Sequence, residues 1–278
     1  MRLSKLITVI IPTYNSEKYI RDCMNSLVLQ SIKPRVLIAD ASSTDRTVDF
    51  IREYGNYLDI TFASIQDNGQ SEGINKALKF VETSHFFWLN SDDIIFNNFV
   101  ELFEIEIKNA KNPLFLTANS VIISNGNIIK NSVGLKLTPR IVKNGVWFGV
   151  FPCVVWRVED LRSLGGLNNL YHYAMDLEAL LRISQSTGVS SNAYVHINQT
   201  LGAFRWHDGS KTGSGNNTLE YNGEMSRLYK EYGIWPFKSK IVSLIIRLKS
   251  YRYIFNRFVN GNHKRINNNL KRIHNYKL

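Results

Sequence analysis

Short apolar runs alternate with amphipathic segments through the first 95 residues. Four runs rich in β-branched or aromatic residues lie at 6–11, 35–40, 60–65 and 85–90. The segments between them carry apolar residues at helical spacing, which predicts helices over 17–30, 44–54 and 71–81. Strands that alternate with helices of this length are typical of βαβ units and a parallel sheet. The pattern therefore predicts an α/β fold whose ligands bind beyond the carboxyl ends of the strands.

The pattern changes after residue 97. Two apolar runs flank Asn125-Gly126, a dipeptide that strongly favours a β-hairpin turn. The Gly/Ser-rich segment 202–217 is expected to be a loop. The remaining expected elements are strands at 153–157 and 191–197 and helices from about 175 and over 217–232.

Length and composition limit the number of domains and indicate the cellular compartment. The chain has 278 residues and is 44% hydrophobic, enough for one large domain or for one domain with an appendage. Cys23 and Cys153 occur in no paired motif, which argues against a disulfide framework or a zinc site. The N-terminus lacks the pattern of a signal peptide, and no apolar run is long enough to cross a membrane. A reducing, cytoplasmic setting is therefore expected.

The net charge of +11 is unevenly distributed along the chain. Residues 236–278 contain eleven Lys and Arg and no Asp or Glu, which leaves 23 basic and 23 acidic residues in 1–235. A neutral body does not have the charge signature of a nucleic-acid-binding protein. We therefore expect a principal domain over 1–235 and a basic helical extension over 236–278.

Polar segments follow each of the four predicted strands. They read PTYN (12–15), DASSTD (40–45), QDNGQSEGIN (66–75) and NSDD (90–93). Each is also ordinary turn chemistry, because Asp, Asn, Ser and Gly are common turn residues. Four such loops at one edge of a parallel sheet nevertheless favour a shared binding site.

The adjacent carboxylates Asp92 and Asp93 raise a specific question. Two ionised carboxylates at the end of a buried strand repel each other and lose hydration unless a cation neutralises them. A divalent cation with oxygen ligands, Mg²⁺ or Mn²⁺, fits this chemistry and also holds a diphosphate. The alternative is a helix N-terminus, where acidic side chains are stabilising.

In this order and spacing, VIIPTYN, LIADASSTD, DNGQSEGINKAL and FFWLNSDDII resemble the family 2 glycosyltransferases with the GT-A fold. The resemblance runs over about 5–235. GGLNNLYHYAMDLEALLR (165–182) and GAFRWHDGSKT (202–212) resemble the members that build bacterial cell-surface polysaccharides. The implied fold is a Rossmann-like, mostly parallel central sheet flanked by helices, with a small β-hairpin element and the C-terminal helical extension.

The resemblance implies a nucleotide-sugar donor bound at these loops. Asp40 would accept a hydrogen bond from the imide N–H of a uracil-like base, which makes a UDP-sugar the expected donor. The other expected donor-binding residues are Pro12, Thr13, Tyr14, Asn15, Asp67, Asn75, Asp92 and Lys211.

The same resemblance implies a divalent metal on the donor's diphosphate. Asp93 would be the direct ligand, with Asp92 on the ribose or the sugar. His207 matches a position that supplies a further ligand to the metal or the diphosphate; the alternative is a surface histidine beside Trp206. The expected cofactor is Mn²⁺ or Mg²⁺.

The resemblance makes Asp176 the candidate catalytic base, because YAMDLEALLRI matches the place where the family has this aspartate. An inverting transfer needs such a carboxylate near the acceptor hydroxyl. Many family members have an acidic residue directly before this aspartate, where this chain has Met175. Asp176 is preferred over Glu178, although an aspartate in a first helical turn also complements the helix dipole. The chain lacks the Q-x-x-R-W element of the processive synthases, which favours transfer of one sugar or a few.

The basic extension contains an amphipathic pattern over 239–258, with apolar residues such as Ile241, Leu244 and Leu248 on one stripe. A basic amphipathic helix favours an anionic membrane surface, here the inner face of the cytoplasmic membrane. The alternatives are a helix docked on the body, a subunit contact such as a homodimer, or, least favoured, nucleic-acid binding.

The resulting prediction is a metal-dependent inverting glycosyltransferase, peripheral to the membrane, that acts on a glycan or polyprenyl-linked acceptor. Two other interpretations stay open. A sugar-1-phosphate nucleotidylyltransferase should show a Gly-rich basic loop after the first strand, where this chain has PTYN. A non-catalytic nucleotide-binding scaffold at the membrane would bind nucleotide without turnover.

Overall fold

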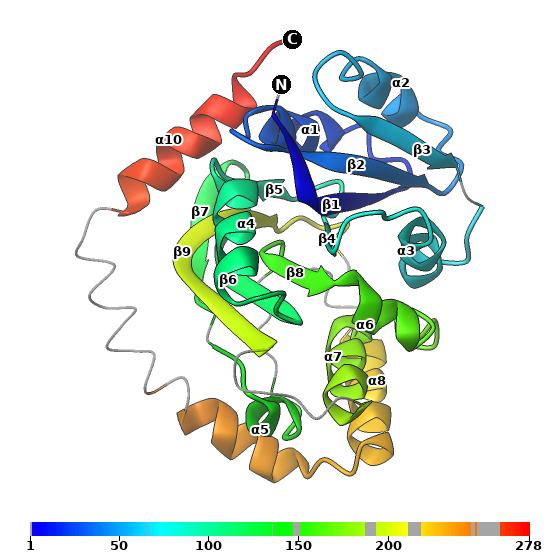
Figure 1. Cartoon of the computed structure of the whole chain (residues 1–278), viewed down its shortest axis with the longest axis vertical. Helices are drawn as coiled ribbons and strands as arrows, with labels where there is room; N and C mark the ends of the chain where they lie inside the picture. Colours follow the sequence, from blue (N-terminus) through cyan, green and yellow to red (C-terminus); the bar gives the residue numbers. More distant parts are fainter. Residues whose placement is uncertain are drawn as a thin grey trace.

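The computed structural model describes residues 2–64, 66–134, 136–146, 151–186, 193–210, 218–245, 248 and 262–278. Its centre is one large sheet (Figure 1). One half of the sheet consists of four parallel strands in the spatial order β3-β2-β1-β4. They are β1 (Leu3–Thr13), β2 (Lys33–Asp40), β3 (Ile60–Ser64) and β4 (His85–Trp88). The predicted parallel half is therefore confirmed.

The other half of the sheet is mixed. β8 (Val154–Arg157) pairs antiparallel with β4, and β6 (Phe115–Ser124) pairs antiparallel with β8. β6 also forms the predicted hairpin with β7 (Asn127–Ser132), around the Asn125-Gly126 turn. β9 (Tyr194–Arg205) runs parallel to β6, and its last residues pair with the two-residue strand β5 (Ile94–Ile95).

Apolar side chains fill both faces of the sheet. Along β4 and just beyond it, Phe86 and Trp88 belong to one core cluster, whereas Phe87 and Leu89 belong to the other. This alternation is the period of two that a strand imposes on its side chains. A strand buried on both faces reads as a continuous apolar run, which is why 85–89 resembled a buried strand in the sequence.

Helices cover each face of the sheet. The cluster that contains Phe87 is closed by α1 (Ile20–Val28), α2 (Thr47–Arg52) and α4 (Phe99–Asn109). The cluster that contains Trp88 is closed by α3 (Gln70–Leu78), α6 (Val158–Ser163), α7 (Met175–Ser186) and α8 (Thr218–Glu231). The short helix α5 (Pro139–Val142) contacts α7. Both cysteines are buried and unpaired.

The last part of the chain contacts the body at two separate places. Residues 236–245 are helical, and the preceding Ile234 is buried in the core beside α8. The final helix α10 (Asn262–His274) packs on α1 beside the chain's N-terminal strand (Figure 1). The buried Asn25 of α1 donates hydrogen bonds from Nδ2 to the carbonyl oxygens of Ile273 (3.1 Å) and Tyr276 (3.3 Å). α10 is thus docked on the body, but it lies beyond the predicted amphipathic segment 239–258. Of that segment, residues 246, 247 and 249–258 lie outside the described residues.

One local prediction was wrong. Residues 202–205, expected in a loop, form the end of β9, because they find strand partners in β6 on one side and in β5 on the other. The alternative interpretation of Asp92 and Asp93 as a helix N-terminus does not hold, because Ile94 and Ile95 form β5 and α4 starts only at Phe99. Among the described residues, no helix is long and apolar enough to span a membrane.

Candidate active site

Thr13 and Asp40 are strand neighbours at the carboxyl ends of β1 and β2. Asp40 is buried, and its carboxylate accepts hydrogen bonds from Thr13 Oγ1 (2.8 Å), Ser43 N (2.9 Å) and Ser43 Oγ (2.6 Å). These three bonds fix the loop after β2 against the end of β1. They leave Asp40 about one of its roughly four lone-pair positions for a further donor.

Asn15 joins the same two loops. It has a positive φ of 46°, a backbone conformation that asparagine tolerates better than most residues. Its backbone N–H donates to Ser43 Oγ (3.0 Å), and its side-chain oxygen accepts from Thr44 N (2.9 Å). The adjacent Tyr14 is 64% exposed, so its ring stands open at this edge. The expected residues Pro12 to Asn15 and Asp40 are thus brought together.

Asp92 faces His207. Asp92 Oδ2 lies 2.8 Å from His207 Nε2, and both side chains are partly exposed, 24% and 23% respectively. The Tyr19 ring lies against the imidazole, with 4.8 Å between ring centroids. Among the described residues there is no cluster of three or more His, Cys, Asp or Glu side chains suited to a metal. The protein therefore offers one carboxylate and one imidazole at this point.

Asp93 has a different environment from its neighbour. It is fully buried, and its carboxylate accepts hydrogen bonds from Arg205 N (2.8 Å) and Asn90 Nδ2 (3.1 Å). Burial, together with the charge of Asp92, raises the pKa of Asp93 well above its usual range. Asp93, the expected metal ligand, ties the end of β9 to the loop after β4.

Arg205 connects these groups and was not singled out by the sequence analysis. Its Nε donates to the carbonyl oxygen of Asp92 (2.8 Å), and its Nη2 donates to the carboxylate of Asp22 (2.8 Å). Its guanidinium also lies over the Tyr19 ring, 4.8 Å from the centroid. The one indication of Arg205 in the sequence was its position two residues before His207. Because residues 202–217 were assigned to a loop, its position at a strand end was not predicted.

Asp67 and Asn75 are engaged within the protein. Asp67 Oδ1 accepts from Gly69 N (3.0 Å). The amide of Asn75 makes three of the four hydrogen bonds available to it: Nδ2 donates to Leu167 O (2.8 Å) and Asn169 Oδ1 (3.1 Å), and Oδ1 accepts from Leu167 N (2.7 Å). Asn75, the expected donor contact, thus also holds the loop that precedes α7.

Asp176 lies in the first turn of α7 and lines a cavity of about 670 Å³. Its Oδ1 accepts from Leu177 N (2.8 Å). Burial raises the pKa of Asp176 to about 6, although backbone hydrogen bonds oppose the shift. Such a carboxylate is ionised at neutral pH yet basic enough to accept a proton.

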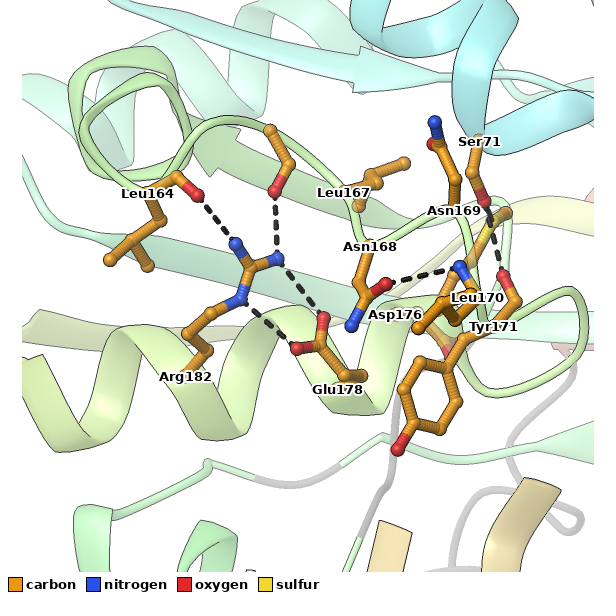
Figure 2. Close-up of polar contacts among 12 residues, drawn as sticks. Ser71, Leu164, Leu167, Asn168, Asn169, Leu170, Tyr171, Asp176, Glu178 and Arg182 are labelled. Atoms are coloured by element: carbon orange, nitrogen blue, oxygen red, sulfur yellow. Dashed lines mark hydrogen bonds and ion pairs between the residues drawn. The ribbon is translucent and has the colours of Figure 1, made fainter. Parts of the chain in front are cut away.

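Glu178, the less favoured base, is occupied. It is 1% exposed and forms a two-point ion pair with Arg182, both distances being 3.0 Å, and it also accepts from Tyr232 Oη (2.9 Å). Arg182 in turn donates to the carbonyl oxygens of Leu164 (2.6 Å) and Gly166 (2.7 Å) (Figure 2). Glu178 thus anchors the loop before α7 and does not face the cavity.

Glu224 of α8 positions the start of α7, and nothing in the sequence marked it. Its carboxylate is buried and accepts three backbone N–H groups, from His172 (2.7 Å), Tyr173 (2.8 Å) and Ala174 (3.0 Å). These donors immediately precede the helix, where free N–H groups need partners. Glu224 is one of several acidic residues on an amphipathic helix, and no local sequence pattern distinguishes it from the others.

The first turn of α3 bridges the two groups of residues. Gln70 Nε2 donates to Asn90 Oδ1 (2.7 Å), in the loop that carries Asp92. Ser71 Oγ donates to Tyr171 O (3.2 Å; Figure 2) and lies 3.0 Å from Met175 Sδ, next to Asp176. One helix end therefore sets the loop of the carboxylate pair relative to the loop of the candidate base. Lys211 lies outside the described residues.

A parallel half-sheet with polar loops at its carboxyl edge is the arrangement expected for the GT-A fold. The model of the glycosyl transferase family 2 matches residues 8–164, and the chain belongs to this family.

Two curated relatives of this chain are bacterial glycosyltransferases that act on polymers. Chondroitin synthase of Escherichia coli is 29% identical over 203 residues, which is 70% of this chain and 28% of that protein. The poly(ribitol-phosphate) beta-N-acetylglucosaminyltransferase TarS of Staphylococcus aureus is 38% identical over 93 residues, 32% of this chain and 16% of the relative. The chain thus spans less than a third of the length of either relative.

Solved structures agree on the fold. Residues 1–349 of S. aureus TarS, in complex with UDP-GlcNAc, superpose with a TM-score of 0.66 at 22% identity, covering 81% of this chain and 66% of that one. Glucosyl-3-phosphoglycerate synthase from Mycobacterium tuberculosis, with Mn²⁺, UDP and phosphoglyceric acid, gives a TM-score of 0.55 at 17% identity, covering 84% and 80%. The GT-A fold expected from the sequence is therefore confirmed.

Proposed function

We propose that the protein is an inverting glycosyltransferase that moves a sugar from a UDP-sugar to a hydroxyl of a glycan or polyprenyl-linked acceptor. The observation that carries this proposal is the first turn of α3, which contacts both the loop of Asp92 and the loop of Asp176. A transferase needs its leaving-group site and its base at one such junction. Family membership supports the reaction class.

The donor nucleotide is assigned to the edge formed by Pro12 to Asn15 and Asp40. The exposed Tyr14 ring offers a stacking surface for a base, and Asp40 retains acceptor capacity for an imide N–H. The structural neighbours were crystallised with UDP-GlcNAc and with UDP, which supports a uridine nucleotide. Asp67 and Lys211 stay assigned to the sugar and the phosphates.

The metal is assigned to Asp92 and His207, with Mn²⁺ or Mg²⁺ as the cation. This changes the expected ligand from Asp93 to Asp92, because only Asp92 is partly exposed and opposite the histidine. One carboxylate and one imidazole leave most positions for diphosphate oxygens and water, as is usual for these cations. When bound, the cation would neutralise charge that develops on the leaving diphosphate.

Asp176 is assigned as the base. The acceptor oxygen forms a bond to the anomeric carbon while the bond from that carbon to the diphosphate oxygen breaks, and the nucleoside diphosphate leaves with the electron pair. Asp176 takes the hydroxyl proton. A single displacement of this kind inverts the anomeric centre. Glu224 contributes by holding the backbone that presents Asp176.

The helical residues 236–245 support a peripheral position at the inner face of the cytoplasmic membrane. Trp235 and Phe237 are 74% and 70% exposed at the start of this segment, and Leu248 is 66% exposed beyond it. Exposed aromatic and aliphatic side chains in a strongly basic extension suit the surface of an anionic membrane. Such a position would bring the enzyme to a lipid-linked acceptor.

The proposal is tested by calorimetric binding of UDP, GDP and dTDP in Mn²⁺ and in EDTA, followed by assay of UDP release from UDP-sugars. Metal-dependent UDP binding with turnover supports the transferase. UDP binding without turnover on any donor would instead identify a non-catalytic scaffold. Absence of nucleotide binding would refute the assignment of the edge.

A further inference from the structure

The cavity that contains Asp176 is built from three separate parts of the chain. One wall comes from the hairpin half of the sheet, including Ser120 and Phe204. A second comes from the start of α7 and from α8, including Tyr173 and Tyr221. The third comes from the basic extension, which contributes Ser239, Lys240, Ser243 and Leu244.

The third wall is fixed to the body. Ile234 is buried in the core and contacts the backbone region of Gly145. Ser239 is 5% exposed, and its hydroxyl lies 3.4 Å from both the carbonyl oxygen of Gly145 and the hydroxyl of Tyr229. The segment 239–244 is therefore a built part of the cavity, although the charge pattern suggested a separate extension.

The lining has the chemistry of a carbohydrate site. It combines aromatic rings, from residues such as Tyr173, Tyr221 and Phe204, with serine hydroxyls. The hydroxyl of Ser120 is buried and has no hydrogen-bond partner among the described residues. A buried hydroxyl without a partner is costly, so a bound hydroxyl at this point would recover the lost interaction.

Charge distinguishes this cavity from one for a neutral sugar. Lys240 is the only cationic side chain among the described lining residues, and Asp176 is the only anionic one. Lys240 is exposed whereas the adjacent Ser239 is buried, so the cavity has solvent access beside Lys240. The candidate base and one cation therefore line the same cavity.

We propose that segment 239–244 forms part of the acceptor site, and that Lys240 pairs with an anionic group of the acceptor while Asp176 receives the reacting hydroxyl. This rests on the proposed transferase function. The anionic group is a carboxylate of an acidic sugar or a phosphate ester. A carboxylate and a phosphate both attract an ammonium group, so Lys240 selects for a negative charge and not for one of these two groups.

Ligand-observed NMR titrations of the enzyme loaded with UDP and Mn²⁺ test the proposal. Three probes differ only at carbon 6 of the sugar: methyl glucuronide carries a carboxylate, methyl glucoside 6-phosphate a phosphate, and methyl glucoside a hydroxyl. We expect at least one anionic probe to bind roughly tenfold tighter than the neutral probe, the size of one charge-assisted contact. The anion that is preferred identifies the source of the charge.

Lys240→Gln should remove this preference. Lys238→Gln is the matched control, because Lys238 is exposed on the same helix and is not among the lining residues. Equal binding of all three probes, or equal effects of the two variants, would overturn the proposal. UDP binding recorded on the same samples separates a failure of the proposed function from a failure of the acceptor site. If UDP does not bind, the transferase assignment is refuted. If UDP binds but no anionic probe is preferred, only the role of Lys240 is refuted.

Discussion

His207 Nε2 lies 2.8 Å from Asp92 Oδ2, although 115 positions separate the two residues in the sequence. The pair joins the loop after β4 to the residues that follow β9. The neighbouring Asp93 turns the other way and binds the backbone N–H of Arg205. Two adjacent carboxylates therefore have different surroundings: Asp92 is partly exposed opposite an imidazole, and Asp93 is buried within the fold.

Asp92→Asn should weaken UDP binding in Mn²⁺ about 10–100-fold, the range seen when a group supporting a metal site is lost. In EDTA the variant and the wild type should bind equally, because the side chain acts through the cation. Calorimetry in both buffers measures this. Asp93→Asn is the comparison: its carboxyl is buried, so it should lower the melting temperature more than it changes the metal dependence. The opposite ranking of the two variants would restore Asp93 as the ligand.

Asp176→Asn should lower kcat by about 10²–10⁴, the usual contribution of a general base, with UDP binding unchanged. In the wild type, activity should rise with pH through about 6, because the base works only when ionised. A flat profile between pH 5 and 7, or a variant that retains full kcat, would remove Asp176 from this role.

The same carboxyl should cost stability at neutral pH. Its folded pKa of about 6 exceeds the usual aspartate value of 3.8, so the folded state binds the proton more tightly than the unfolded state does. The contribution of Asp176 to wild-type stability should therefore fall as pH rises between about 4 and 6, by roughly 2–3 kcal/mol at most. Denaturant unfolding should find Asp176→Asn more stable than the wild type at pH 7.5, with the difference shrinking toward pH 4.

Glu224→Gln should lower kcat while leaving the affinity for UDP unchanged. The carboxylate accepts three backbone N–H groups before α7, and an amide offers only one oxygen in its place. The loss of charge-assisted bonds should also destabilise the fold by about 1.5–3 kcal/mol. Glu220→Gln is the control, because Glu220 lies on the same helix and, among the described residues, accepts only the hydroxyl of Tyr173. Equal effects of the two variants would argue against a positioning role.

Gly166→Ala should destabilise the protein more than Gly165→Ala. Both glycines have positive φ, 93° and 78° respectively, so both substitutions impose backbone strain of about 1 kcal/mol. Only at Gly166 would the added Cβ clash with the amide of Asn75, while Gly165 has open space. Thermal unfolding measures the difference, and a smaller kcat for Gly166→Ala would connect the loop to Asp176. Similar melting temperatures would mean that Asn75 moves aside.

Local patterns were sufficient to predict the parallel half of the sheet, the β6–β7 hairpin and the helices that carry Asp176 and Glu224. Each of these elements has a period or a turn signal of its own. The pairing of residues 202–205 was not predictable, because a glycine-containing segment becomes a strand only when β5 and β6 supply partners.

The site was predicted in outline only. Sequence periodicity locates the strand ends, and Pro12 to Asn15, Asp40 and the two aspartates lie at or just after those ends. Which aspartate faces solvent depends on a turn, and the role of Asn75 depends on a loop that lies 92 positions away. Arg205 and Glu224 act through contacts between distant segments, and no local pattern contains that information.

β9 fixes the spacing between the two sides of the site. Phe204 lines the cavity that contains Asp176, and the next residue, Arg205, holds the loop of the aspartates. Neighbouring side chains on a strand point to opposite faces, and a shift by one residue exchanges the faces. With β5 and β6 paired along both edges of this segment, a one-residue insertion or deletion before Phe204 would misplace both side chains at once. Length variation in this protein should therefore be confined to its surface loops and excluded from residues 200–205.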